Sequence, residues 1–301
     1  MMSFKSGFVS VVGRPNVGKS SLVNNLIGTK VSIVTNKAQT TRNNIRGILT
    51  KEDDYQLIFM DTPGVHTPQK ELDKVLNSTA FRSIKDSDVA LFVVPANEKI
   101  GKNDLLLLKD LLKKDVPKVL LISKTDLVTP EELQTKIAEW ATIAPELEQV
   151  ITFNVGDDNS KANLIQALVD LVPESDYQFY PNGQHSDQST RFLIKEILRE
   201  NILFKAGQEV PHSVAILVDE LQQTTTDINI LATIIVERQS QKGIILGHQG
   251  DKIKDIKYKT RKELKRLFNK NIHLEVFVKV QENWRNSPSL LKKMGYDKDK
   301  Y

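Results

Sequence analysis

The sequence predicts a mixed α/β protein of two domains: first a mostly parallel sheet with helices on both faces, then a compact α+β module. Apolar, strand-like runs alternate with helix-like segments through the first part of the chain, and the alternation stops near Pro173. Such alternation is typical of parallel strands joined by crossover helices. The chain has 301 residues, more than one hydrophobic core usually serves, so two domains are expected.

A polar segment separates the two expected domains. Residues 174–189 are polar, contain Pro181 and Gly183, and are interpreted as an exposed linker. We therefore expect a first domain over 1–173, the linker over 174–189 and a second domain over 190–301. The predicted strands of the first domain are 7–12, 55–60, 88–94, 117–122 and 148–153.

The second domain has a different order of elements, which indicates an α+β module without repeats. Its apolar periodicity predicts helices and strands in one compact set. In chain order these are a helix over 190–206, strands over 212–221 and 227–237, an apolar then glycine-rich segment over 241–248, a helix over 250–269 and a strand over 272–280.

Composition limits the compartment and the partners. The chain contains no cysteine, which excludes disulfides and thiolate metal sites and favours a reducing cytosol. No apolar run approaches the ~20 residues that a membrane span needs, so a soluble, unprocessed, cytoplasmic protein is expected. The net charge of +4 hides an asymmetry, because residues 189–301 carry 21 Lys/Arg against 14 Asp/Glu. Positive charge is therefore concentrated toward the C-terminal end.

The most specific motif lies between the first predicted strand and the first helix. Gly13-Arg14-Pro15-Asn16-Val17-Gly18-Lys19-Ser20, followed by Ser21, has the pattern of a P-loop. Glycines let backbone N–H groups turn toward a polyphosphate at a helix N-terminus. Lys19 can neutralise the outer phosphates and Ser20 can bind Mg²⁺. An ordinary glycine-rich turn is the less favoured alternative, and the motif predicts binding of a nucleoside triphosphate.

Two further segments fit the same site. Asp61-Thr62-Pro63-Gly64 follows a strand, so that the carboxylate can hold a magnesium water and the Gly64 N–H can meet a γ-phosphate. Gln39-Thr40-Thr41-Arg42 lies between this motif and the P-loop. A threonine there could complete the magnesium shell, and the sequence leaves Thr40 and Thr41 as alternatives, beside that of a solvated loop.

The strand over 117–122 ends in Ser123-Lys124-Thr125-Asp126, and here the chain resembles translation-factor-type GTPases. Asp126 can accept two protons of guanine, and the Lys124 stem can cover the base. The chain departs from the usual pattern at Ser123, where a hydroxyl replaces an amide. It departs again at Asn154-Val155, where a Ser-Ala pair is usual. Guanine selectivity through Asp126 is expected, with reduced affinity.

Val65 follows Gly64, where many small GTPases carry a glutamine that orients the attacking water. A valine cannot hydrogen-bond to water. The resemblance is therefore to the hydrophobic-substituted GTPases, which implies slow intrinsic hydrolysis unless a partner or ion rearranges the site. No general base is evident. Asn16 matches a position that can help to bind K⁺ in such proteins, and a loop-capping asparagine is the equal alternative.

Several segments of the second half, together with the P-loop and the Gln39–Arg42 motif, carry a closer resemblance. They are Arg191 to Glu200, Pro211-His212-Ser213-Val214-Ala215, Gly243 to Gly250, Trp284-Arg285-Asn286, Leu290-Leu291 and Gly295-Tyr296. On these residues the whole chain resembles the Era family of bacterial GTPases. The resemblance implies a P-loop GTPase domain followed by a type-2 KH domain. It also implies a monomer that binds Mg²⁺ and GTP or GDP and meets the 3′ end of 16S rRNA during 30S subunit assembly, with peripheral membrane association.

The KH interpretation also has physical support. Gly247-His248-Gln249-Gly250 is a GxxG loop, whose glycines allow a sugar–phosphate backbone to pass between two helices. Residues 251–270 hold nine Lys/Arg against three acids, and helical spacing turns much of this charge outward, while Ile253, Ile256, Leu264 and Leu267 lie on or near the buried side. A plain turn beside a solvated helix is the alternative. The RNA-binding candidates are Gly243, Ile244, Ile245, Gly247, His248, Gln249, Gly250, Lys252, Ile253, Lys254, Lys257 and Arg261, of which the isoleucines could equally be core.

We therefore expect a guanine-nucleotide switch. The triphosphate state would order the loops over 36–47 and 61–75 and change how the KH domain meets RNA. Lys19, Thr40 or Thr41, and Gly64 are the candidate catalytic residues, for phosphoryl transfer to water. One alternative is an ATP-dependent phosphotransferase, which would leave Asp126 unexplained. The other is a degenerate switch whose C-terminal module docks to protein or membrane.

Overall fold

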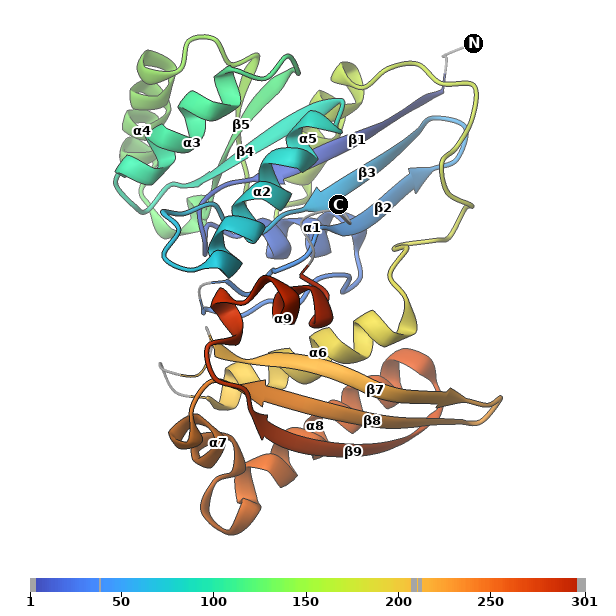
Figure 1. The fold of residues 1–301 in the computed structure, drawn as a ribbon. Coiled ribbons are helices and arrows are strands. Elements are labelled where there is room, and N and C mark those ends of the chain that lie inside the picture. Colours follow the sequence, from blue (N-terminus) through green and yellow to red (C-terminus); the bar gives the residue numbers. More distant parts are fainter. Residues whose placement is uncertain (1–3, 38, 207–209, 211–212, 297–301) are drawn as a thin grey trace.

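A computed structural model describes residues 4–37, 39–206, 210 and 213–296. These residues form two halves, one above the other in Figure 1, with the linker over residues 174–189 running down one side. The upper half is a sheet with helices on both faces, and the lower half is a three-stranded sheet backed by helices. The mixed α/β fold class expected from the sequence is confirmed.

The upper sheet has six strands in the order β2-β3-β1-β4-β5-β6. All neighbouring strands are parallel except β2, which pairs antiparallel with β3 in the register Ile48↔Ile58. The strand β2 was missed in the sequence, where its first residues were included in the 36–47 loop. The strands are β1 (Lys5–Val12), β2 (Ile45–Lys51), β3 (Tyr55–Asp61), β4 (Val89–Pro95), β5 (Lys118–Ser123) and β6 (Gln149–Thr152).

Helices cover both faces of this sheet and close two cores. One core joins the sheet to α1 and α5, and the other joins it to α2, α3 and α4. The α2 helix begins at Glu71, so the last five residues of the loop expected over 61–75 are helical and the loop ends at Lys70. The helices are α1 (Lys19–Ile27), α2 (Glu71–Lys85), α3 (Lys102–Leu112), α4 (Pro130–Ile143) and α5 (Asp158–Leu171), with a short 3-10 turn η1 (Thr125–Leu127).

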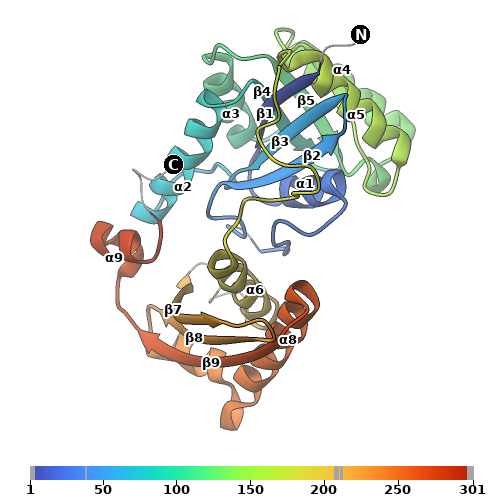
Figure 2. The same cartoon turned by 90° about the vertical axis from the view of Figure 1, so that its right-hand side faces the viewer.

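The linker lies against the upper sheet and crosses it in Figure 2. The Ile48 N–H donates to the His185 carbonyl at 2.9 Å, and Gly47 forms an isolated bridge with Ser186. Phe179 packs edge-on against Phe8, with ring centroids 5.0 Å apart. None of residues 174–189 is buried, as expected for an exposed linker.

The lower half has the helix-strand-strand-helix-helix-strand order of a type-2 KH domain. Strand β8 pairs antiparallel with β7 and parallel with β9, and the helices close one core on a single face. Pro211 and His212, two residues that carry the family resemblance, lie outside the described residues. The elements are α6 (Thr190–Lys205), β7 (Ala215–Gln223), β8 (Asp227–Val236), α7 (Gln239–Leu246), η3 (His248–Gly250), α8 (Asp251–Phe268), β9 (Asn271–Val280), η4 (Trp284–Asn286) and α9 (Pro288–Lys293).

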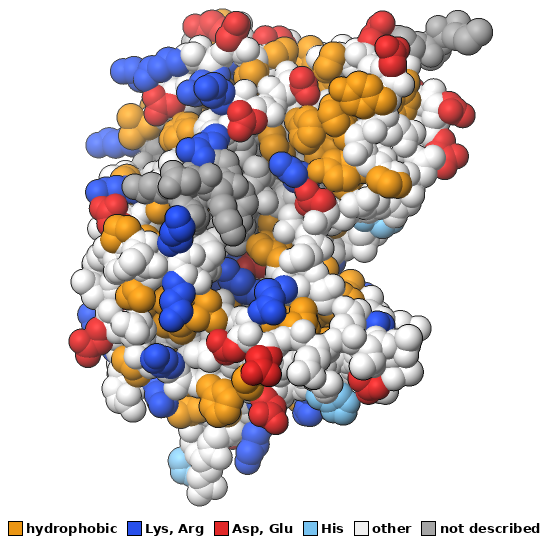
Figure 3. Space-filling model, turned by 45° about the vertical axis from the view of Figure 1, so that its right-hand side comes forward, with side chains coloured by type: hydrophobic (Ala, Val, Ile, Leu, Met, Phe, Trp, Pro, Cys, Tyr) orange, Lys and Arg blue, Asp and Glu red, His pale blue; other side chains and the backbone are white. Residues whose placement is uncertain are grey.

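The two halves share an apolar contact that the sequence did not predict. Leu72 and Leu76 of α2 pack in one cluster with Trp284, Met294 and Tyr296 from the end of the chain. Trp284 and Tyr296 stack with ring centroids 6.1 Å apart. Away from this contact the waist of the molecule is hollowed, as Figure 3 shows. The segment after β9 therefore joins the lower half to the helix that follows the Asp61–Gly64 motif.

Among the described residues, no helix is both long and apolar enough to span a membrane.

Candidate functional site

The P-loop lies where the sequence placed it, between the end of β1 at Val12 and the start of α1 at Lys19. At two positions of the site, close contacts leave no room for a side chain and so require glycine. A Cβ on Gly13 would lie 2.5 Å from the Val93 carbonyl oxygen, and one on Gly64 would lie 2.6 Å from the Pro15 nitrogen. The Asp61–Gly64 turn therefore packs directly on the P-loop, and the backbone of both faces one pocket.

Lys19 is buried and bends back over the loop. Its Nζ donates to the carbonyl oxygens of Gly13 at 3.0 Å and Arg14 at 2.9 Å. Burial lowers the pKa of Lys19 to about 8, although the nearby Asp61 carboxylate opposes the shift. A cation held at a loop of backbone amides is suited to neutralise phosphate oxygens, which would replace the two carbonyl acceptors.

Three oxygen-bearing side chains from three separate segments meet beside Lys19. The hydroxyls of Ser20 and Thr41 are 2.8 Å apart, and the Thr41 hydroxyl lies 3.5 Å from Asp61 Oδ2. Burial raises the pKa of Asp61, and hydrogen bonds from Ser20 and Thr41 offset part of that rise. Asp61 Oδ1 is buried without a hydrogen-bond partner among the described residues. A hard cation with oxygen ligands fits this set, and Mg²⁺ matches its chemistry.

The geometry distinguishes the two threonines. The Thr40 hydroxyl donates to the Lys37 carbonyl oxygen at 2.6 Å and contacts the Thr35 hydroxyl, away from Ser20. Thr41 is buried and faces Ser20. Of the two alternatives that the sequence left open, Thr41 is the better placed for magnesium.

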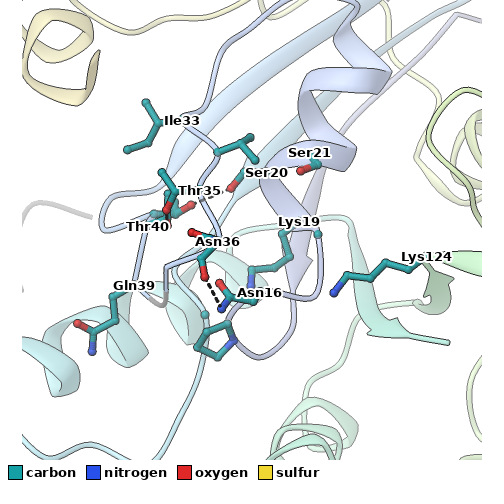
Figure 4. Close-up of a pocket in the computed structure, with 15 residues that line it drawn as sticks. Asn16, Lys19, Ser20, Ser21, Ile33, Thr35, Asn36, Gln39, Thr40 and Lys124 are labelled. Atoms are coloured by element: carbon teal, nitrogen blue, oxygen red, sulfur yellow. Dashed lines mark hydrogen bonds between the residues drawn. The ribbon is translucent and has the colours of Figure 1, made fainter. Parts of the chain in front are cut away.

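A pocket of about 380 Å³ lies over these residues. In Figure 4, Lys19 and Lys124 extend from one side and the segment with Thr35, Asn36 and Gln39 closes the other. Asn16 has a φ of +66° and donates through Nδ2 to the Asn36 carbonyl oxygen at 3.3 Å, so it joins the P-loop to this segment. That contact resembles the loop-capping alternative for Asn16, whose side chain also lines the pocket.

Ser123 lies at the start of the loop expected to bind the guanine base, and its hydroxyl contacts the backbone of two other segments. Its hydroxyl is 2.7 Å from the Val17 carbonyl oxygen in the P-loop and 3.1 Å from that of Val94. The shorter side chain of Ser123 therefore joins this loop to the P-loop. Lys124 adopts a φ of +58°, and Asp126 is exposed.

Thr125, Asn154 and Val155, the other residues expected near the guanine base, make fewer side-chain contacts. Thr125 bonds to the Phe153 carbonyl oxygen at 3.4 Å, which brings the loop after β6 beside η1. The Asn154 backbone is held by Ser160, and the Val155 side chain is 58 % exposed. Neither residue supplies a side chain equivalent to the family serine, in agreement with the departure seen in the sequence.

A network around His66 was missed in the sequence analysis. Its ring lies 3.1 Å from the Gly64 carbonyl oxygen through Nδ1 and 3.1 Å from Gln39 through Nε2. Gln39 also donates to Asp73 at 2.7 Å. The hydrogen bond with Asp73 raises the pKa of His66. Val65, the next residue before His66, is buried in the core, and its side chain has no polar group that could bind a water.

The GxxG loop lies at the tip of the lower half, between α7 and α8 (Figure 1). Gly247 and Gly250 both have positive φ, +75° and +78°. A Cβ on Gly247 would lie 2.8 Å from the Lys252 Cβ, so this position requires glycine. His248 and Gln249 are exposed. The loop therefore presents backbone and two exposed side chains at a helix junction, as the sequence predicted.

The side chains around the loop divide into core and surface. Ile245 is buried in the core of the lower half, which favours the core alternative for it, whereas Ile244 and Ile253 are half-buried. Leu267 is exposed, contrary to the expectation that it faces the core. The four basic RNA-binding candidates on α8 are all exposed or half-buried: Lys252, Lys254, Lys257 and Arg261.

Fold and site together define a P-loop GTPase joined to a KH domain. Models of known families agree: one described as a 50S ribosome-binding GTPase matches residues 8–124, and a KH-domain model matches residues 209–285.

Two solved structures are similar along nearly the whole chain. A crystal structure of Era with MgGDPNP and nucleotides 1506–1542 of 16S ribosomal RNA has a TM-score of 0.93 and 33% identity, covering 98% of this chain and 99% of that one. An Era variant from Aquifex aeolicus bound to GDP·AlF₄⁻ has a TM-score of 0.92 and 33% identity, covering 97% and 99%. The chain belongs to the Era family, as its sequence motifs indicated.

Proposed function

We propose that this protein is a GTP-hydrolysing switch that binds the 3′ end of 16S rRNA through its KH domain and assists assembly of the 30S subunit. One observation carries the proposal: Ser20, Thr41 and Asp61 converge beside Lys19 in a chain whose other half presents a GxxG loop. The related Era structure holds MgGDPNP and 16S rRNA together, which supports both halves of the proposal.

The roles of the residues follow from their positions. Ser20 and Thr41 would hold Mg²⁺, and Asp61 would hold one of its waters; the ion, when bound, neutralises charge on the phosphates. Lys19 stabilises negative charge that develops on the transferred phosphoryl group, and the backbone N–H of Gly64 meets its outer oxygens. Val65 cannot orient the attacking water, so intrinsic hydrolysis is slow. The rest of the P-loop from Gly13 to Ser21 encloses the phosphates.

Base selection belongs to the loop after β5. Asp126 accepts two guanine protons, Lys124 covers the base, and Ser123 holds both to the P-loop. Thr125, Asn154 and Val155 form the surrounding wall, and Thr62 and Pro63 complete the turn under the phosphates. K⁺ at Asn16 is part of the proposal, because Asn16 lines the same pocket as Gly18, Lys19 and Ser20 of the P-loop.

The RNA path runs over the GxxG loop. The backbone of single-stranded RNA would pass Gly247 to Gly250, while bases meet Ile244, Ile253 and the exposed Gly243. Lys252, Lys254, Lys257 and Arg261 would contact phosphates. We further propose domain boundaries of 1–173 and 190–301, a monomeric protein in the cytoplasm, and peripheral association with the inner face of the membrane.

The decisive experiment measures RNA binding by the full chain in two nucleotide states. A labelled RNA with the sequence of the 16S 3′ end is titrated in the presence of GDP or a non-hydrolysable GTP analogue, and GTP hydrolysis is followed separately. Tighter RNA binding in the triphosphate state, with GTP but not ATP competing for the pocket, supports the proposal. Equal RNA affinity in both states would remove the switch, and ATP competition would favour the phosphotransferase alternative.

A further inference from the structure

One helix of the RNA-binding half contacts the segment that closes the nucleotide pocket. Arg199 of α6 is fully buried, and its Nη2 donates to the Thr40 carbonyl oxygen of the other half. Its Nε and Nη2 also bond to Glu196, one turn earlier on the same helix. A buried guanidinium costs several kcal/mol unless it is paired, so Glu196 allows Arg199 to lie at this interface.

The acceptor of this bond determines its effect. The Thr40 carbonyl belongs to the same peptide plane as the N–H of Thr41, and a peptide group is nearly rigid. A donor that fixes this carbonyl therefore fixes the direction in which the chain enters Thr41. The Thr41 hydroxyl lies 2.8 Å from Ser20. Arg199 thus orients the residue that the proposed magnesium site needs.

Neighbouring contacts hold the same segment to the lower half on both sides. The Val34 N–H donates to Glu200 Oε1 at 3.0 Å, and Arg42 donates through Nη1 to the Val214 carbonyl oxygen at 2.7 Å. Lys30 joins Glu200 to Glu263 of α8. The segment from Val34 to Arg42, which closes the nucleotide pocket, is therefore supported by α6 and by the residue before β7.

We propose that Arg199 is a positioning residue for GTP hydrolysis, supplied by the RNA-binding half. It does not touch the nucleotide. It acts through the Thr40–Thr41 peptide, so its removal lets Thr41 leave Ser20 without changing the P-loop. The inference rests on the proposed function, because it assumes that Thr41 serves the triphosphate state.

Loss of Arg199 should affect the binding of GTP and GDP differently. Contacts of such a segment with Mg²⁺ and the γ-phosphate are made in the triphosphate state and released after hydrolysis. Loss of Arg199 should therefore lower kcat and the affinity for a GTP analogue, while GDP affinity stays near that of the wild type. A purely structural role would lower both affinities together or lower neither.

The test uses the full chain and three variants. Arg199→Met together with Glu196→Gln removes both buried charges at once, so that no unpaired carboxylate remains. Arg199→Lys keeps the charge but has one donor group in place of the fork. Arg191→Met is the control, because Arg191 lies on the exposed side of the same helix and bonds to Val218 within the lower half. Thermal unfolding verifies that each variant is folded.

Fluorescent GDP and GTP-analogue binding, and the kcat and KM of GTP hydrolysis, are then compared. The expected result is a kcat about 10- to 100-fold lower in the double variant, the size of a misplaced reacting group. Partial recovery is expected in Arg199→Lys and no change in Arg191→Met. A double variant that is folded and has wild-type kcat, or that loses GDP and GTP-analogue affinity equally, overturns the proposal. Failure of the wild type to hydrolyse GTP would instead contradict the proposed function.

Discussion

The nucleotide site and the RNA-binding loop use opposite means to present functional groups. Lys19, Thr41 and Asp61 are buried, come from three segments, and face one another over short distances. His248 and Gln249 are exposed on a single loop, and the lysines that follow lie on one helix. The first site depends on the packing of the whole upper half, whereas the second depends on a local turn and accumulated charge.

This difference determines how each site should respond to change. In a buried site each group is desolvated, so the loss of one removes a large and specific interaction. At an exposed basic face, each charge is screened by salt and contributes a smaller, additive share of affinity. Substitutions should therefore produce abrupt losses in the upper half and graded, salt-dependent losses in the lower half.

The largest effect is expected for Lys19→Ala. Removing the buried cation should lower GTP and GDP affinity by about 1000-fold or more, because two or more charge-assisted hydrogen bonds to phosphate are lost. Lys161→Ala is the matched control, since Lys161 bonds to the Asn25 carbonyl oxygen at the end of α1, away from the phosphates. Isothermal titration with each nucleotide provides the measurement. Unchanged affinity in Lys19→Ala would contradict the P-loop assignment.

The next largest effect tests the exposed loop. His248→Asp with Gln249→Asp should reduce RNA affinity by about 100-fold at low salt, because two carboxylates repel the phosphate backbone. Nucleotide affinity should not change, because the loop lies at the tip of the lower half, between α7 and α8, whereas the residues of the nucleotide pocket all belong to the upper half. His248→Ser with Gln249→Ser is the neutral control. Full RNA binding by the aspartate variant would place the RNA elsewhere.

Base selection should be altered by one exposed carboxylate. Asp126→Asn should lower GTP affinity by about 2 kcal/mol and favour xanthosine triphosphate, because the amide reverses one donor–acceptor pairing. Competition between the two nucleotides against a fluorescent analogue measures the preference. If GTP is still preferred by the variant, the base is recognised by other residues.

The pKa of Lys19 leads to a smaller, pH-dependent effect. Because burial lowers this pKa to about 8 in the nucleotide-free protein, Lys19 is charged below pH 8 and becomes neutral above it. Phosphate restores the charged form, so above pH 8 binding requires proton uptake, and GDP affinity should fall by up to about tenfold per pH unit.

Binding measured between pH 7 and 9 tests this expectation. Lys19→Arg stays charged over that range and should show a flat profile at whatever affinity it retains. A flat profile in the wild type would mean that Lys19 keeps its proton without nucleotide.

The smallest effect concerns Ser123, whose hydroxyl lies within hydrogen-bonding distance of two buried carbonyl oxygens. Ser123→Ala should weaken GDP binding by about 1 kcal/mol, the net value of a typical hydrogen bond. Ser123→Thr keeps the hydroxyl and should bind GDP like the wild type if its methyl group is accommodated. Equal affinity in Ser123→Ala would show that the P-loop does not need this tie.

Much of the fold was determined by sequence patterns that act locally. The five parallel strands, the GxxG loop and the α6 and α8 helices were predicted because apolar period, glycine position and helix spacing are short-range properties. Strand β2 was missed, since Ile45–Lys51 lies on the edge of the sheet and mixes apolar with polar residues. The loop expected over 36–47 therefore included the first residues of this strand.

The nucleotide motifs could also be recognised from sequence alone, because a P-loop, an Asp-x-x-Gly turn and a base-binding loop each form within a few consecutive residues. Only the tertiary structure decided between Thr40 and Thr41, since both lie in one loop and the choice depends on where Ser20 sits. Likewise, Glu196 and Arg199 would be taken as solvated helix charges from their spacing. Their burial against Thr40 arises only when the two halves pack together, because long-range contact, rather than local pattern, sets which charges lose water.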